Sequence, residues 1–281
     1  MPLLSHKKTT TPESLLMLDA VTRRSGMIAL REGGNLPPLL YYHRVAPEAD
    51  PDTGPVPEVF DRQMGLLKFL GFRGVSLREA LTASPSDSAG MIGITFDDGY
   101  EDNYEWAAPI LEKYGFRGTI FCVTGVLGQK TAWAEDPRWV GHPLMTPGQA
   151  RELSRRGFEI AAHSRTHPDL TTLSGKELED EVSGSRRELE DLLGEPVVTF
   201  CYPYGFYNEE TKEEARKAGY LAARSTRRMT PGKGELQFDL PARSISGEMS
   251  LARFALTVAG YRLMEELRNP VAPVWASGEG R

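Results

Sequence analysis

Residues 91–100 read Met-Ile-Gly-Ile-Thr-Phe-Asp-Asp-Gly-Tyr, an apolar run that ends on two adjacent carboxylates and a glycine. The run predicts a buried strand, because short apolar segments that end at a turn residue are typical of strands in a protein core. Gly99 predicts a sharp turn at the strand end. Side by side, Asp97 and Asp98 would repel each other unless a positive charge lay next to them. A metal ion is the natural candidate.

A second apolar run, residues 158–162, precedes a pair of histidines. His163 and His167 lie in the segment Ala-Ala-His-Ser-Arg-Thr-His-Pro. Two histidines spaced four apart can reach one ion if the segment turns helically. Two imidazoles and one carboxylate form an open catalytic site that suits zinc, and also cobalt, nickel or iron. One acid of the pair would then ligate the ion, and the other would take a proton from the attacking water.

The acid pair also has a plainer interpretation. Asp and Gly favour turns at strand ends, so Asp98 and Gly99 alone would predict an ordinary turn. That interpretation gives no reason for Asp97, which is the costlier of the two acids to bury. The pair therefore favours a functional site.

Short strands and helices alternate along the rest of the chain. We expect strands over residues 39–42, 73–75, 91–96, 119–124, 158–162, 197–201 and 220–223. We expect helices over residues 14–30, 60–70, 77–81, 103–114, 146–156, 176–193 and 209–218. This alternation predicts an α/β fold with a parallel sheet that is open or closed into a barrel. In such folds the catalytic residues lie at the carboxyl ends of the strands. The acid pair, the histidine pair and His43 are all expected at such ends.

The 281 residues suffice for one large catalytic domain. We assign this domain to residues 37–270, a polar and helical extension to residues 1–36, and a tail to residues 271–281. A net charge of -6 with scattered basic residues argues against a nucleic-acid partner, and we expect a monomer. Cys122 and Cys201, the two cysteines, are predicted to be buried thiols.

The sequence shows no apolar run of signal-peptide or membrane-spanning length. We therefore expect a cytoplasmic protein without a transmembrane segment. An extracellular or cell-envelope location is the alternative if the start codon is misassigned.

Three motifs resemble those of the polysaccharide deacetylases, the NodB-homology enzymes of carbohydrate esterase family 4. They are Thr-Phe-Asp-Asp-Gly-Tyr (95–100), His-Ser-Arg-Thr-His (163–167) and Tyr-Pro-Tyr-Gly (202–205). The resemblance covers residues 37–245 and implies a single-domain distorted (β/α) barrel. It implies that Asp98, His163 and His167 hold the metal and that Asp97 is the general base. It further implies that Tyr202, Pro203 and Tyr204 line the active-site groove, with the Tyr204 N–H as oxyanion donor.

The family's general acid is a histidine near the C-terminus, but no histidine follows His167. Residues 40–45, Leu-Tyr-Tyr-His-Arg-Val, resemble instead the N-terminal segment of the circularly permuted branch, which includes the poly-N-acetylglucosamine deacetylases. The resemblance thus implies that His43 protonates the leaving amine. A structural histidine that ends a strand is the alternative.

Two further positions are open. Cys201 stands where many members have an arginine that orients the catalytic Asp, and Arg243 is a substitute for it or else part of a surface salt bridge. The segment 133–142, with Trp133 and Trp139, contacts substrate or packs in the core.

The family resemblance implies a metal-dependent hydrolase of non-peptide carbon–nitrogen bonds. It would remove N-acetyl groups from an N-acetylglucosamine-containing glycan, with metal-bound water attacking the acetyl carbonyl. The alternatives are an amidohydrolase with a closed pocket for a small amide or cyclic imide, and a degenerate, non-catalytic carbohydrate-binding protein.

Overall fold

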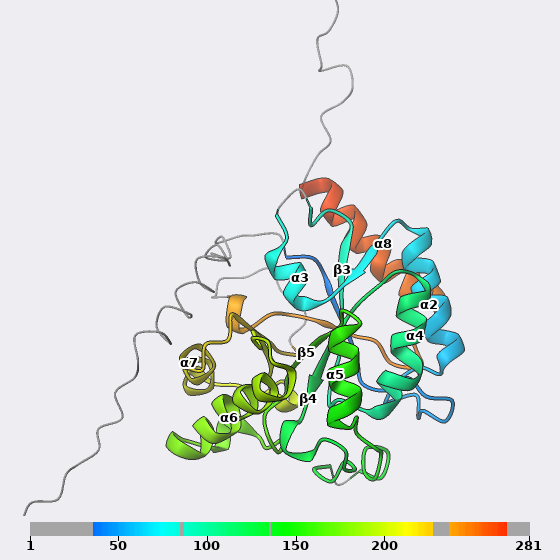
Figure 1. Cartoon of the computed structure of the whole chain (residues 1–281). Helices are drawn as coiled ribbons and strands as arrows, with labels where there is room; N and C mark the ends of the chain where they lie inside the picture. The colour runs from blue at the N-terminus through cyan, green and yellow to red at the C-terminus, as the bar shows by residue number, and fades with distance from the viewer. Residues whose placement is uncertain (1–35, 85–86, 135, 227–235, 269–281) are drawn as a thin grey trace, which may run out of the picture. The chain divides into compact units, whose positions relative to one another are not determined.

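The computed structural model describes residues 36–84, 87–134, 136–226 and 236–268 (Figure 1). The helix expected over residues 14–30 and the tail expected over residues 271–281 lie outside these ranges.

One eight-stranded sheet carries the fold. Its strands are β1 (Leu39–Tyr42), β2 (Arg73–Val75), β3 (Met91–Phe96), β4 (Thr119–Cys122), β5 (Glu159–Ala162), β6 (Thr199–Cys201), β7 (Ala222–Arg224) and β8 (Arg243–Ser244). They lie in the order β7-β6-β5-β4-β3-β1-β8, with β2 also paired to β3. Every pairing between these strands is parallel, so their carboxyl ends lie at one edge of the sheet.

The two outer parts of this curled sheet are joined by the segment 240–245. The Leu240 amide donates to the Ala223 carbonyl at 2.9 Å, which ties the start of the segment to β7. The Ile245 amide donates to the Tyr41 carbonyl at 3.0 Å, which ties its end to β1. The expected α/β fold with a distorted, barrel-like parallel sheet is confirmed.

Helices cover the outside of the sheet (Figure 1). They are α2 (Pro57–Phe69), α3 (Leu77–Thr82), α4 (Ala108–Lys113), α5 (Pro147–Arg155), α6 (Gly175–Leu193), α7 (Glu209–Lys217) and α8 (Leu251–Arg268). Short helical turns are η1 (Asn103–Ala107), η2 (Thr124–Val126), η3 (Leu170–Thr172), η4 (Pro203–Gly205) and η5 (Leu236–Phe238). The helix expected over residues 103–114 begins as the π-helical turn η1, and β8 and α8 were not predicted.

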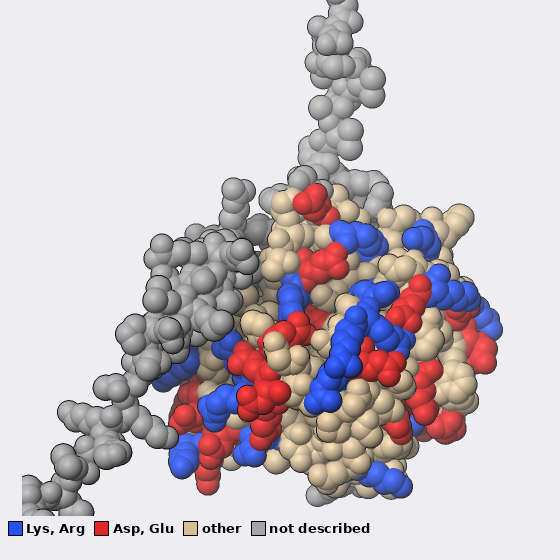
Figure 2. All heavy atoms as spheres, in the orientation of Figure 1, with Lys and Arg blue, Asp and Glu red and all other residues tan. Residues whose placement is uncertain are grey.

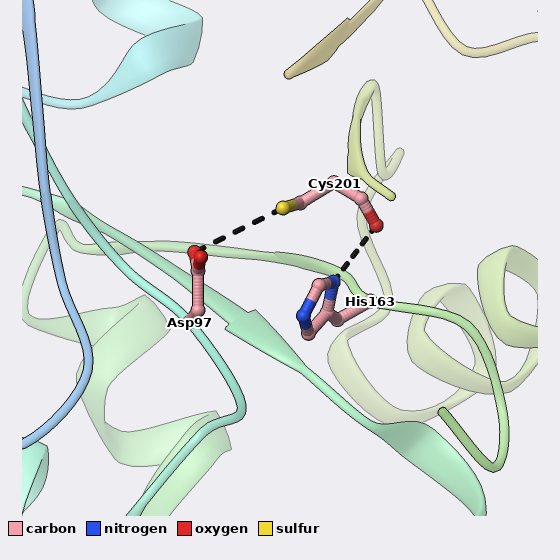
Figure 3. A group of neighbouring side chains, drawn as sticks. All are labelled: Asp97, His163 and Cys201. Carbon is pink, nitrogen blue, oxygen red and sulfur yellow. Dashed lines mark hydrogen bonds between the residues drawn. The ribbon is translucent and has the colours of Figure 1, made fainter. Parts of the chain in front are cut away.

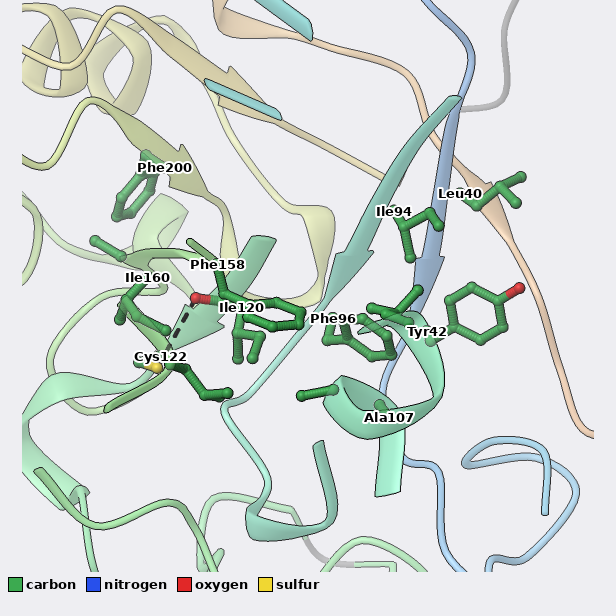
Figure 4. Close-up of a cluster of buried hydrophobic side chains, with 14 of the residues drawn as sticks. Leu40, Tyr42, Ile94, Phe96, Ala107, Ile120, Cys122, Phe158, Ile160 and Phe200 are labelled. Carbon is green, nitrogen blue, oxygen red and sulfur yellow. Dashed lines mark hydrogen bonds between the residues drawn. The ribbon is translucent and has the colours of Figure 1, made fainter. Parts of the chain in front are cut away.

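The core follows from the alternation of side chains along the strands. On β1, β3, β4, β5 and β6 the even-numbered residues pack between sheet and helices, as Figure 4 shows for Leu40, Tyr42, Ile94, Phe96, Ile120, Cys122, Ile160 and Phe200. Odd-numbered positions on the same strands therefore point to the inner side of the curled sheet. Cys122 and Cys201 are both free and buried, which confirms the prediction of buried thiols.

The charged side chains are mixed on the face seen in Figure 2, where basic and acidic residues alternate. Many of them pair, as Arg156 does with Glu112 at 2.7 Å. In the described ranges no helix combines the length and the apolar character needed to cross a membrane.

Candidate active site

The candidate catalytic and metal-binding side chains lie together at the carboxyl ends of five strands. His43 follows β1, Asp97 and Asp98 follow β3, and His163 follows β5; Cys201 and Arg224 end β6 and β7. A cavity of about 280 Å³ opens there. Its lining consists of Tyr41, His43, Asp97, Asp98, Trp133, Ala134, Trp139, His163, His167, Tyr202, Tyr204, Gly205 and Thr226.

Both acids of the opening motif reach this cavity because the backbone kinks between them. Asp97 continues the strand alternation and points inward, opposite to Phe96 in the outer core. Asp98 would point outward, but it adopts φ 70° and Gly99 adopts φ 74°. A Cβ at Gly99 would also lie only 3.1 Å from Cys122 Sγ. The glycine thus allows the turn that brings both carboxylates to one site.

Residues 163–167 form a non-helical turn, whereas we expected a helical one. Ser164 and His167 both have positive φ, and the His167 amide donates to Ser164 Oγ at 3.0 Å. Glu181 on α6 accepts the amides of Arg165 and Thr166 at 2.8 and 2.9 Å. These bonds bring His163 and His167 to within 4.9 Å of each other, measured between ring centroids.

Asp98, His163 and His167 form a buried cluster of one carboxylate and two imidazoles that suits a divalent metal ion. Asp98 Oδ1 lies 3.4 Å from His163 Nε2 and 3.3 Å from His167 Nε2. Burial alone would raise the pKa of Asp98, but hydrogen bonds from both histidines outweigh it and hold that pKa well below its usual value. Burial lowers the pKa of His167, which favours the neutral ring that a metal requires.

His163 is held in the orientation that a ligand needs. Its Nδ1 lies 2.8 Å from the carbonyl oxygen of Cys201, as Figure 3 shows. A proton on Nδ1 donates to that carbonyl, so Nε2 could ligate an ion in place of its hydrogen bond to Asp98. The residues present therefore fit a metal ion on Asp98, His163 and His167.

Asp97 is paired with a residue that the sequence analysis missed. The guanidinium of fully buried Arg224 donates to both carboxylate oxygens of Asp97 and lies 2.9 Å from Cys201 Sγ. Its charge also lies over the ring of Tyr41, 4.6 Å from the centroid. Arg224 therefore occupies the place in which we expected Arg243.

Arg243 lies on the other face of the sheet. Its register partner on β1 is Leu40, which packs in the outer core, whereas Tyr41 one residue later lines the cavity. Paired residues of parallel strands point the same way, so Arg243 points outward. The expectation that Arg243 orients Asp97 is corrected by this register. The sequence feature that could have indicated Arg224 is its position as a charged residue directly after the strand expected over residues 220–223.

His43 also lies near Asp97, with its Nε2 4.0 Å from Asp97 Oδ2. The Asn103 side chain donates to the His43 carbonyl at 3.1 Å, and the ring of Trp139 meets the imidazole edge-on at 4.9 Å. A buried pair, Arg44 and Asp102, lies directly behind it at 2.8 Å. Acid and base candidates thus share one cavity and come from neighbouring strands.

The Tyr-Pro-Tyr segment contributes unequally to the cavity. Tyr202 and Tyr204 line it, whereas Pro203 is buried and lies outside the lining, contrary to expectation. Trp133 and Trp139 both line the cavity, so the segment that carries them faces the site. Trp133 stacks on His167 at 4.7 Å between ring centroids.

The backbone of the site is strained. Four non-glycine residues in the described ranges have positive φ: Asp98, Ser164, His167 and Tyr204. Such conformations cost about 1–3 kcal/mol each and persist where surrounding structure imposes them. Three of the four line the cavity, and Ser164 lies between the two histidines. This concentration of strain marks the cavity as the functional site.

Residues 85–223 match the model of the polysaccharide deacetylase family. The chain belongs to this family. The matched polysaccharide deacetylase domain contains all three motifs described above, whereas His43 and Arg224 lie outside the matched residues. The circularly permuted arrangement therefore stays a prediction.

Individual relatives agree with the family. YxkH of Bacillus subtilis (strain 168), a protein named for this family, is 29% identical over 229 residues, 80% of this chain and 77% of its own. The poly-beta-1,6-N-acetyl-D-glucosamine N-deacetylase of Staphylococcus aureus (strain MSSA476) is 26% identical over 171 residues, 57% of each chain. The Streptococcus pyogenes deacetylase PplD, solved in complex with acetate, aligns with a TM-score of 0.66 and 26% identity over 79% of this chain and 97% of its own.

Proposed function

We propose that the protein is a metal-dependent hydrolase that removes N-acetyl groups from an N-acetylglucosamine-containing glycan. One observation carries this proposal: the buried cluster of Asp98, His163 and His167 lies in the same cavity as Asp97 and His43. A set of metal ligands next to two proton-transfer groups is an arrangement that can hydrolyse an amide. The metal's identity is open among zinc, cobalt, nickel and iron.

A divalent ion on the three ligands would polarise the acetyl carbonyl and activate the attacking water. Asp97 takes the proton of that water, because its carboxylate lines the cavity beside the cluster of Asp98, His163 and His167. His43, whose Nε2 lies 4.0 Å from Asp97 Oδ2, then delivers a proton to the leaving nitrogen. The Tyr204 amide is the proposed oxyanion donor, since the amides of Gly205 and Phe206 are used within the turn.

Arg224 acts through Asp97 and does not reach the cavity lining. Its donation to both oxygens of Asp97 fixes the carboxylate plane. We assign to it the orienting role that we expected of Arg243.

The substrate assignment rests on the relatives. The S. aureus relative is named for N-deacetylation of poly-N-acetylglucosamine, and PplD was solved with acetate, the product of such a reaction. The cavity of about 280 Å³ lies just below the range for small-molecule sites, which begins at about 300 Å³. We infer that it takes one N-acetylated sugar unit.

The first experiment measures acetate release from N-acetylglucosamine oligomers by the zinc-loaded protein. We expect Asp97→Asn to lower kcat by about 10²–10⁴-fold, the contribution of a general base, and a chelator to abolish the activity. Glu101→Gln is the matched control, because this nearby acid lies outside the cavity lining.

Retained activity in Asp97→Asn would refute the role of Asp97. Hydrolysis of cyclic imides without acetate release from any sugar would support the small-amide alternative. Binding of oligomers without hydrolysis of either substrate would support the non-catalytic alternative.

A further inference from the structure

A buried tyrosine hydroxyl lies next to the metal-ligand cluster without a complete hydrogen bond. Tyr100, the last residue of the motif Thr-Phe-Asp-Asp-Gly-Tyr, is 0% exposed. Its hydroxyl makes no hydrogen bond of ordinary geometry to any residue that the structure describes. A buried hydroxyl without a full partner destabilises the folded protein, so its presence calls for an explanation.

The acceptor beside this hydroxyl is the candidate ligand Asp98. Burial raises the pKa of Tyr100 well above its usual value, and the charge of Asp98 and a loose hydrogen bond to that carboxylate raise it further. Tyr100 therefore stays protonated at neutral pH and can only donate to a carboxylate. The two imidazoles of the cluster approach Asp98 at Oδ1, 3.4 Å from His163 Nε2 and 3.3 Å from His167 Nε2. The hydroxyl is thus a third donor next to this one carboxylate.

The position of Tyr100 is fixed from two directions. Its backbone forms an antiparallel bridge with Leu144, and the preceding Gly99 carbonyl accepts the Met145 amide at 2.9 Å. The guanidinium carbon of the buried Arg44 lies 5.7 Å from the centroid of its ring. These contacts hold the ring in place without using its hydroxyl, which remains available to Asp98.

Tyr100 does not line the cavity, so its contact with the site is through Asp98. We propose that Tyr100 is a positioning residue for metal binding, whose hydroxyl donates to Asp98 and holds this carboxylate beside His163 and His167. This inference rests on the metal site of the proposed function. Groups that hydrogen-bond a metal ligand from behind contribute about 10–100-fold to metal affinity.

Zinc affinity, measured by competition with a chromogenic chelator and without any substrate, tests this role. Tyr100→Phe keeps the ring over Arg44 and removes only the hydroxyl. We expect it to weaken the Kd for zinc by about 10–100-fold. Tyr220→Phe is the matched control, because it also removes a buried tyrosine hydroxyl, one that donates to the Val182 carbonyl at 3.1 Å outside the cavity lining. Its zinc Kd should equal that of the wild-type protein.

The visible absorption spectrum of the cobalt-loaded protein is a second readout, because it depends on the geometry of the ligands. We expect the bands to shift in Tyr100→Phe and to stay unchanged in Tyr220→Phe. An unchanged zinc Kd in Tyr100→Phe, or an equal loss in Tyr220→Phe, would overturn the inference. A lower Tm of the chelated Tyr100→Phe protein with wild-type Kd and spectrum would assign the hydroxyl a purely structural role and also overturn it.

These measurements separate the inference from the proposed function. If the wild-type protein released acetate with zinc and Tyr100→Phe bound zinc normally, only the inference would fail. If zinc binding depended on Tyr100 but the wild-type protein released no acetate, the inference would hold and the proposed hydrolysis would fail. Absence of zinc, cobalt, nickel and iron binding by the wild-type protein would refute both.

Discussion

At the scale of single residues, the decisive contact is the one between Asp97 and Arg224. Both side chains are buried, so neither charge has water to stabilise it if the other is removed. Cys201 fits beside them because its thiol is small enough to lie against both groups. An arginine at position 201 would compete with Arg224 for the same space. The chain therefore supplies the orienting charge from β7 instead of β6.

We expect Arg224→Met to destabilise the protein by about 3–5 kcal/mol, because it leaves Asp97 as an unpaired buried charge. The double variant Asp97→Asn, Arg224→Met should be less destabilised than the sum of the single variants, since it removes both charges. Urea unfolding of the four proteins measures the coupling. Arg243→Met is the control and should show no coupling to Asp97→Asn. Additive free energies for the Arg224 pair would contradict the proposed contact.

At the scale of elements, the conformation of the turn η4 depends on a glycine at position 205. Gly205 combines positive φ with contact against Thr226, whereas Gly115 has a similar φ of 72° and open space around it. At both positions a residue with a Cβ would be strained by the positive φ. Only at Gly205 would the Cβ also clash with a neighbouring side chain. The two positions therefore separate conformational strain from packing.

Gly115→Ala should cost about 1–2 kcal/mol of unfolding free energy, the cost of a left-handed Cβ, and leave deacetylation unchanged. Gly205→Ala should cost more and also lower kcat/KM, because the clash with Thr226 displaces Tyr204. Thermal unfolding and acetate release measure the two effects. If both variants behaved alike, the contact at Gly205 would have no functional consequence.

Much of the site could be predicted because its residues lie directly after strands. Asp97, Asp98, His163 and His43 each follow an apolar run, and parallel strands bring such positions together. Arg224 also follows an apolar run, but the sequence around it does not distinguish it from an ordinary charged residue at a strand end. Its partner is 127 residues away in the sequence, and no local pattern links the two.

The backbone conformations of the turn at residues 163–167 and of the turn at Tyr204 could not be predicted from the sequence either. The spacing of His163 and His167 predicts a helical turn, but Glu181 on α6 fixes a different one through the intervening amides. Tyr204 has positive φ, and Gly205 after it lies against Thr226, which follows another strand. Tertiary contacts, rather than local propensity, decided both conformations.

At the scale of the whole molecule, metal binding at the candidate ligands would be coupled to folding, because these residues come from the end of β3 and from the loop after β5. The unfolded chain does not hold these ligands together. An ion that binds only the folded state therefore stabilises the entire domain.

Zinc at 100-fold excess over its Kd should stabilise the fold by about 2.7 kcal/mol, which corresponds to a Tm increase of about 5–10 °C for a domain of this size. Asp98→Asn and His163→Ala should lose this increase, because each removes a candidate ligand. Asp97→Asn should keep it, although it loses activity. Differential scanning calorimetry with and without a chelator tests the division of roles between the two acids. A loss of the increase in Asp97→Asn would contradict that division.

The segment that carries Trp133 and Trp139 is bound at its base by backbone bridges. Lys130 pairs with Pro143, and the Thr131 amide donates to the His142 carbonyl at 2.9 Å. His43 and Asp97, by contrast, are fixed by adjacent strands whose ladder continues through the bond from the Asp97 amide to the Tyr42 carbonyl. The segment and the two strand ends thus have separate backbone supports, although Trp139 packs on His43 and Trp133 on His167. Under the proposed function, grafts between residues 131 and 142 that keep both rings are a route to new glycan specificities.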